Sequence, residues 1–320
     1  MTRKERVLAA ASGKPVDRAP FSLWYHFHLE DPSGASLARA ELEFFRRFQP
    51  DFLKVMHDIP YELPAGMREV QSPSDWARLQ VLPPASGNFG RQLEALSAIL
   101  EQLGDDPPPV IDTVFNVFAT AQKVSGQSVL EHLRAEPEPV LQGLSTIADS
   151  LAGFAGACME VGLSGVFLAV AGANTDLMTE DEYARVFLPL DRRVLDGTSG
   201  RAVFNVVHIH GANIMLELVS KLPCHALSWS DRASGPSLGE GRKWFSGGVI
   251  GGINEQTVAG QTPEQVAEDV RDALRQTSGR SLLVGPGCAV PTPQSEGELA
   301  QWDARIAAVR RELEAFRYPW

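Results

Sequence analysis

The sequence predicts a (β/α)8 barrel, the TIM-barrel architecture, as one domain spanning residues 1–320. Short apolar or β-branched runs alternate with longer amphipathic stretches, which is typical of parallel strands joined by crossover helices. Eight such runs occur, and nearly all are followed by a helical stretch. A chain of 320 residues suits one closed barrel of this kind.

The predicted strands are short runs in which apolar residues predominate. They cover Pro20 to Trp24, Asp51 to Met56, Val110 to Phe115, Val166 to Val170, Ala202 to Val207, Ala226 to Trp229, Val249 to Ile253 and Leu282 to Gly285. The alternative is an open doubly wound sheet, which would need a glycine-rich phosphate turn after its first strand. The segment 24–28 reads WYHFH and contains no glycine, so the barrel is favoured.

The predicted helices follow these strands, except that the sixth strand lacks a clear one. They cover Ala35 to Phe48, Gly90 to Leu103, Pro137 to Val161, Thr179 to Asp196, Ala212 to Lys221, Thr262 to Thr277 and Gln294 to Phe316. A short helix is expected at the N-terminus, where Thr2 and Glu5 have the spacing of a capping box. The proline-containing stretch from Ile59 to Asn88 is expected to form an insertion over one barrel face.

The charge balance narrows the possible partners. The chain has 29 basic and 40 acidic residues, a net charge of −11, and no block of consecutive basic residues. Binding to nucleic acid or to an anionic membrane surface needs a basic footprint, so both are disfavoured. No apolar run approaches the roughly 18–20 residues that span a bilayer, and the N-terminal apolar stretch is too short for a secretion signal. We expect a cytoplasmic protein that acts on a small molecule, and an oligomer is compatible with the sequence.

Polar and aromatic residues gather after the predicted strands, where the loops of this fold carry the chemistry. Five of the seven histidines and one of the three cysteines lie there. We expect one site at one barrel mouth, with His26, His28 and His57 in the same pocket as His208. The candidates are Trp24, His26, His28, His57, Asp58, Asn116, Asn174, His208, His210, Trp229, Asp231, Asn254 and Cys288.

The segment His208-Ile209-His210 is the sharpest of these patterns. Side chains two residues apart on an extended segment point to the same face, so both imidazoles can converge on one point. Cys288 would follow the last strand, and a closed barrel would bring it to the fifth. Two nitrogens and one thiolate suit zinc with an open fourth position. Alternatively, the two histidines form a hydrogen-bonded pair at a strand end and Cys288 is a buried apolar residue.

Asp58 directly follows an apolar strand. A carboxylate there can orient a substrate or serve as an acid or base, but it can also cap the turn before Pro60. Trp24 and Trp229 are candidates for stacking against a planar substrate, or for packing at the barrel rim.

Several segments together resemble the uroporphyrinogen decarboxylase superfamily along essentially the whole chain. GKPVDRAP at 13–20 is similar to the family's "PVDRxP" start, and the stretch from FRRF at 45–48 to Asp58-Ile59 is similar to the approach to its catalytic aspartate. LSW at 227–229 is similar to "LDW", and GGIN at 251–254 to "GNLDP". The resemblance implies a (β/α)8 barrel and places Asp58 on the catalytic aspartate of the decarboxylase branch.

The superfamily contains two chemistries. True decarboxylases carry an arginine-rich "RQAGR" segment after the first strand, which holds the porphyrinogen carboxylates. Segment 25–29 here is YHFHL, without arginine. A substrate with eight carboxylates would lose its main electrostatic partners, which argues against porphyrinogen decarboxylation.

The other branch comprises zinc-dependent methyltransferases that move a methyl group from a corrinoid protein to a thiol. Their zinc is held by an "HxC" pair and a "PGC" cysteine. This chain has His208-Ile209-His210 at the first motif and Pro286-Gly287-Cys288 at the second. The resemblance therefore implies zinc held by His208, His210 and Cys288, and a corrinoid donor. Histidine in place of the first cysteine makes the site one charge unit more positive.

Three hypotheses follow. The leading one is a zinc-dependent methyltransferase whose pocket includes Asp58, His26 and His28. The second is a decarboxylase that needs no cofactor, with Asp58 stabilising a protonated pyrrole. The third is a non-catalytic barrel that binds a corrinoid protein. Metal content separates the first two.

Overall fold

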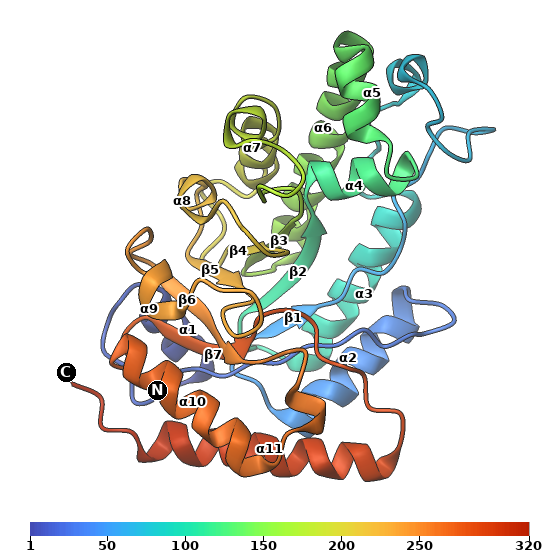
Figure 1. Cartoon of the computed structure of the whole chain (residues 1–320). Helices are drawn as coiled ribbons and strands as arrows, with labels where there is room; N and C mark the ends of the chain where they lie inside the picture. Colours follow the sequence, from blue (N-terminus) through green and yellow to red (C-terminus); the bar gives the residue numbers. More distant parts are fainter. Residues whose placement is uncertain (320) are drawn as a thin grey trace.

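Seven parallel strands curl into a barrel in the computed structural model, which describes residues 1–319. The strands pair in chain order, each with the next. Helices cover the outside of this sheet (Figure 1). The strands are β1 (Leu53–Val55), β2 (Val110–Phe115), β3 (Gly165–Val170), β4 (Val206–Ile209), β5 (Ala226–Trp229), β6 (Gly248–Ile253) and β7 (Leu282–Pro286).

The predicted first strand, Pro20 to Trp24, is reduced to an isolated bridge between Phe21 and Val284. The segment still joins the two edges of the sheet. Its backbone bonds to Val284 on one side, and the Asp51 amide donates to the Phe21 carbonyl on the other at 2.7 Å. The Phe21 amide donates to the Asp51 carboxylate, and Pro20 has no amide hydrogen to donate. A regular ladder of strand hydrogen bonds therefore cannot extend along this segment. The barrel fold is confirmed, with seven strands and a bridging segment instead of eight strands.

The fifth strand begins and ends later in the chain than the sequence predicts. Strand β4 begins at Val206, four residues after the predicted start at Ala202. Asn205 bonds through its amide nitrogen to the His225 ring and through its side chain to the Val166 amide, so the ladder starts after it. His208 therefore lies within the strand.

The long helices agree with the prediction to within a few residues, and Pro137 to Val161 was predicted at its observed bounds. The predicted helix from Ala212 to Lys221 shrinks to Leu216–Val219 because Ile214 pairs with Asn174 in an antiparallel bridge. The helices are α1 (Arg3–Ala11), α2 (Gly34–Phe48), η1 (Pro73–Arg78), α3 (Gly87–Leu103), α4 (Val117–Val124), α5 (Val129–Ala135), α6 (Pro137–Val161), α7 (Glu180–Asp196), α8 (Leu216–Val219), α9 (Leu238–Gly241), η2 (Val258–Gly260), α10 (Pro263–Thr277) and α11 (Glu296–Ala315).

Two apolar clusters follow from the alternation of side chains along the strands. The larger cluster fills the space between sheet and helices. The smaller cluster fills the barrel interior, with residues such as Phe52, Met56, Phe167 and Val206. Helix α1, which has the predicted capping box of Thr2 and Glu5, adds apolar residues to this interior cluster.

The segment between β1 and α3 contains the short helix η1 and little other regular structure. Trp76 of η1 is fully buried and donates to a His132 ring nitrogen at 3.1 Å. The boundary of an insertion at about 59–88, and the single-domain organisation, stay predictions. None of the helices in residues 1–319 has both the length and the apolar character that crossing a membrane requires.

Candidate functional site

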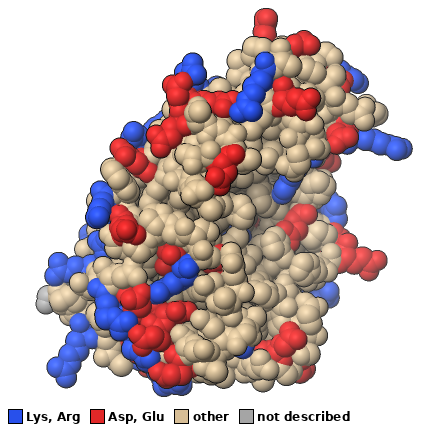
Figure 2. Space-filling model, in the orientation of Figure 1, with Lys and Arg blue, Asp and Glu red and all other residues tan. Residues whose placement is uncertain are grey.

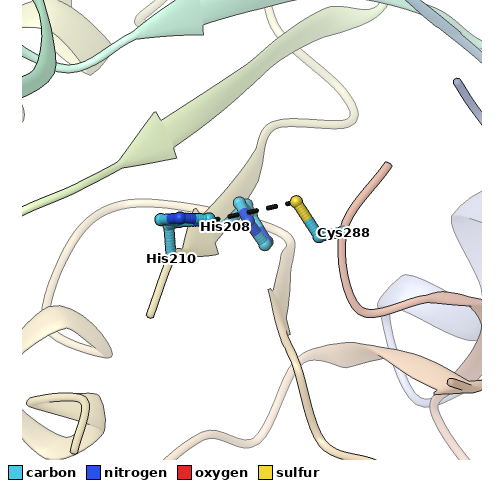
Figure 3. A group of neighbouring side chains, drawn as sticks. All are labelled: His208, His210 and Cys288. Carbon is cyan, nitrogen blue, oxygen red and sulfur yellow. Dashed lines mark hydrogen bonds between the residues drawn. The ribbon is translucent and has the colours of Figure 1, made fainter. Parts of the chain in front are cut away.

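Three side chains from distant parts of the chain converge at the carboxyl end of the barrel. His208 lies in β4, His210 follows it, and Cys288 lies two residues beyond β7. Their potential ligand atoms all lie within 4.8 Å of one another, and the Cys288 Sγ is 3.9 Å from His210 Nδ1 (Figure 3). The predicted alternation along β4 and the closure of the barrel together account for this convergence.

Gly287 lets the loop after β7 come close to its neighbours. A Cβ atom at this position would lie 2.6 Å from the Ser230 Cα and 2.7 Å from the Glu255 carboxylate. A side chain there would push the loop outward and take Cys288 away from the histidines. Glycine before this cysteine is thus a steric requirement of the site.

The surroundings of His208 fit a metal ligand. The side chain is 4% exposed and stacks on Phe167, with ring centroids 5.4 Å apart. Its Nδ1 lies 3.3 Å from the Ser228 hydroxyl, while its Nε2 is buried with no hydrogen-bond partner in the described structure. One ring nitrogen fixed by a neighbour and the other left open is the usual arrangement of a metal-bound histidine.

The spacing of the three ligand atoms also suits zinc. Tetrahedral bonds of about 2.0–2.1 Å to nitrogen and 2.3 Å to sulfur would separate a nitrogen from the sulfur by about 3.6 Å. The observed 3.9 Å between Cys288 Sγ and His210 Nδ1 is close to this value. Small side-chain movements would bring all three donors onto one ion.

The Cys288 thiol is held in an environment that favours its ionised form. Burial alone would raise its pKa, but the neighbouring His208 imidazole, with a smaller effect of Lys54, lowers the pKa below its ordinary value. The thiolate is the form that binds a metal.

Two cavities meet at His210 and Cys288. The inner cavity, about 310 Å³, extends into the barrel and has largely aromatic and small apolar walls, including Trp24, Phe115 and Phe167. The outer cavity, about 510 Å³, lies toward the loops. Both are lined by His26, His210, Cys288 and Ala289, whereas His208 lines only the inner one. In Figure 2 the molecule is hollowed near the middle of this face, mainly between uncharged residues.

His26, which lines both cavities, pairs with Asp58, which lines neither. The His26 Nδ1 lies 2.8 Å from an Asp58 carboxylate oxygen. Desolvation would raise the Asp58 pKa, but the bond to His26 and its charge outweigh this, so the pKa is lowered. An imidazole oriented by a carboxylate can accept or donate a proton. His28 lines the outer cavity only.

His57 and Trp229 point away from the site, contrary to the expectation of one shared pocket. Positions 52, 54 and 56 of the first strand region face the barrel interior, so His57 faces the helices. It packs on Phe154 and lies 3.2 Å from the Asp112 carboxylate. Trp229 likewise alternates outward, and its indole donates to the Pro236 carbonyl at 2.6 Å. Neither lines either cavity.

Four other candidates also lie outside both cavities. Asn116 caps α4 and donates to Asp191 at 3.0 Å. Asp231 accepts from the Gly252 amide, and burial raises its pKa to about 7. Asn254 caps the following turn, and Asn174 belongs to the bridge with Ile214. Substrate contacts by these four residues stay predictions.

The family model for uroporphyrinogen decarboxylase (URO-D) matches residues 55–308. The chain belongs to the uroporphyrinogen decarboxylase family. Two curated relatives, the methylcobamide:CoM methyltransferases MtbA of Methanosarcina acetivorans and Methanosarcina mazei, are 24% and 23% identical to it. The alignments cover 90% and 92% of this chain and 93% and 95% of the relatives.

A solved structure, described as a methyltransferase from Methanosarcina mazei, superposes with a TM-score of 0.79 at 19% identity. The superposition covers 97% of this chain and 99% of that one, which confirms the fold. Together with the curated relatives, it confirms the resemblance to the methyltransferase branch of the uroporphyrinogen decarboxylase family. The prediction of an enzyme, a methyltransferase, is confirmed by the same relatives.

Three charged residues that line the two cavities are not among the site residues predicted from the sequence. Lys54 and Lys123 line the inner cavity, and Glu255 lines the outer one. Glu255 is 6% exposed, and its Oε2 has no hydrogen-bond partner among the described residues. Lys54 could have been noticed, because it lies within a predicted strand two positions before the inward Met56 and is the only charged residue between Phe52 and Met56. Lys123 and Glu255 lie outside the strands and gave no such signal.

Proposed function

We propose that this enzyme transfers a methyl group from a corrinoid, carried by a partner protein, to a small thiol, with zinc at His208, His210 and Cys288. The observation that carries the proposal is the convergence of these three residues where two cavities meet, with His210 and Cys288 lining both cavities and His208 lining the inner one. Methyl transfer needs an acceptor and a donor to reach one point from different sides. The smaller inner cavity suits a small acceptor, and the outer cavity faces the loops where a larger donor can approach.

The proposed reaction forms one bond and breaks another. The thiol loses its proton, a sulfur–carbon bond forms, and the cobalt–carbon bond of the donor breaks with its electron pair left on cobalt. Zinc bound at the three residues would hold the acceptor sulfur as a thiolate. His26, oriented by Asp58, is positioned to take the proton at the mouth of the cavity.

The residues that line the inner cavity support the same reaction. Aromatic residues such as Trp24 and Phe167 would help a bound acceptor to exclude water from the inner cavity, which would strengthen electrostatic interactions there. His210, in place of the cysteine in the family's "HxC" motif, is a neutral ligand. A site with one thiolate is more positive than a site with two, so it favours ionisation of the bound thiol while making the thiolate a weaker nucleophile.

The proposal is tested by metal content and methyl transfer. Protein purified without added metal should contain about one zinc per chain. Cys288→Ser should lose most of this zinc and the transfer of methyl from methylcobalamin to mercaptopropionate, followed by cobalamin absorbance. Cys224→Ser is the matched control, because Cys224 precedes β5 at the other end of the barrel.

Two results would contradict the proposal. One is wild-type metal content in Cys288→Ser. The other is a zinc-loaded wild type that transfers no methyl to any thiol. Decarboxylation of a porphyrinogen by metal-free protein would favour the decarboxylase alternative. Tight binding of a corrinoid protein without turnover would favour a non-catalytic role. A cytoplasmic location and an oligomeric state stay predictions.

A further inference from the structure

Lys54 places a positive charge inside the barrel. It occupies the middle of β1, between the inward positions of Phe52 and Met56, and is only 5% exposed. Interior positions of such barrels are ordinarily filled by aliphatic residues. Lys54 instead lines the inner cavity together with His208 and Cys288.

The Lys54 ammonium has weak partners. Its hydrogen-bond partner is the Met56 sulfur at 3.0 Å, and its Nζ lies 5.0 Å and 5.9 Å from the ring centroids of Phe167 and Trp24. No ion pair joins it to a carboxylate in residues 1–319. Glu41, and more weakly Cys288, Asp58 and Asp112, favour its charged form without forming an ion pair with it. The Glu41 carboxylate itself accepts from the Met56 amide.

The cavity as a whole has an unusual charge for this protein. Lys54 and Lys123 line it, and none of its lining residues is Asp or Glu. The chain carries 40 acidic against 29 basic residues, so a cavity lined by two lysines and no carboxylate is a local reversal. A buried cation without an ion-pair partner is costly, and an anion supplied by a ligand would offset that cost.

We propose that Lys54 binds the anionic end of the acceptor, a carboxylate or sulfonate, at the floor of the inner cavity. The acceptor is then a small acid whose other end reaches His208, His210 and Cys288. The proposal takes the inner cavity as the acceptor site, and to that extent it rests on the proposed function. Lys54 thereby determines which acceptors are bound.

A purely structural role for Lys54 makes a different prediction. If Lys54 served only to stabilise the fold through its contacts with the Met56 sulfur and the aromatic rings, its replacement by methionine would destabilise the protein. Methionine has a similar length and no charge. A lysine retained for ligand binding leaves the fold equally or more stable when its buried charge is removed. Burial also lowers the Lys54 pKa to about 8, in accord with a charge that lacks a strong partner.

The experiment uses five probes, four of which vary charge and thiol independently. Mercaptopropionate and mercaptopropanol carry a thiol with and without a carboxylate, and propionate and propanol are their thiol-free counterparts. Mercaptoethanesulfonate tests a sulfonate in place of the carboxylate. Binding of each probe to the zinc-loaded protein is measured by ligand-observed NMR. We expect wild type to bind each acid more tightly than its neutral counterpart by about tenfold or more, the range for a charge-assisted hydrogen bond.

Two variants and a control decide the outcome. Lys54→Met should lose the preference for acids, with or without a thiol, while its urea midpoint is unchanged or higher. Lys54→Arg should keep the preference. Lys221→Met, which removes the same charge at an exposed position, should behave as wild type.

An unchanged preference for acids in Lys54→Met would overturn the inference, and so would an equal affinity of wild type for acids and alcohols. If Lys54→Met unfolds, Lys54→Gln gives the same comparison. Failure of the proposed function would look different, because the thiol would then add nothing to the binding of either acid or alcohol.

Discussion

His208 and His57 both lie at the carboxyl ends of barrel strands, but they face opposite sides of the barrel wall. His208 faces the interior, where its Nε2 is buried without a partner in the described structure. His57 faces the helices, where its ring packs on Phe154 and lies 3.2 Å from the Asp112 carboxylate. The inward residue has a polar atom left over for a ligand, and the outward residue uses its polar group to hold the wall together.

The same contrast holds for charged groups. Lys54 faces inward and has only a sulfur and two aromatic rings near its ammonium. Asp112 faces outward. Its carboxylate accepts a hydrogen bond from the Gln92 side chain and also contacts the His57 ring. Unsatisfied polar groups in a buried position are costly, so His208 Nε2 and the Lys54 ammonium mark points on the inner face where a ligand can bind.

The largest effect is expected from replacing the inward histidine. His208→Gln should lower zinc content and reduce methyl transfer by about a hundredfold or more, since even residues that only support metal ligands cost about 10- to 100-fold. Metal analysis and the cobalamin assay measure both. Retention of full metal content in this variant would break the contrast between the two faces.

A pH-dependent effect is expected from the helix layer. Asp191 of α7 is fully buried, and burial raises its pKa to about 6. The folded state then holds a proton that the unfolded state releases near pH 4, so stability falls as pH rises from about 4 to 6.

Asp191→Asn should remove this part of the pH dependence. Relative to the variant, wild type should lose about 1–3 kcal/mol between pH 4 and pH 6.5, measured as unfolding free energy in urea. A difference between the two proteins that stays constant with pH would show that Asp191 titrates alike in the folded and unfolded states.

A smaller effect is expected from the outward histidine. His57→Gln should lower the free energy of unfolding by about 1–2 kcal/mol, because Asp112 loses a buried partner. Zinc content should not change. This variant carries the same substitution as His208→Gln, so loss of metal in both would mean that the two histidines are not functionally distinct.

The convergence of His208, His210 and Cys288 could be predicted because it depends on two general properties of the fold. Side chains two apart in a strand share a face, and a closed barrel joins its first and last strands. The orientation of His57 and Trp229 follows from the same alternation. Proximity to a strand end alone does not distinguish the two faces of the wall, so it does not exclude either residue from the site.

Other features could not be obtained from spacing. Strand β1 has only three residues, so the inward position of Lys54 depends on the register of its neighbours. The failure of Pro20 to Trp24 to form a strand depends on the Asp51 side chain, which takes the Phe21 amide. The meeting of two cavities where the three residues converge is a property of side-chain packing.

The central claim is that one metal ion binds between the two cavities. Anomalous scattering at the zinc absorption edge, from crystals of protein purified without added metal, tests it most directly. The account predicts a single strong peak within about 2.0–2.3 Å of His208, His210 and Cys288 donor atoms. No peak there in zinc-replete crystals, with the Cys288 sulfur more than about 5 Å from both imidazoles, would contradict it.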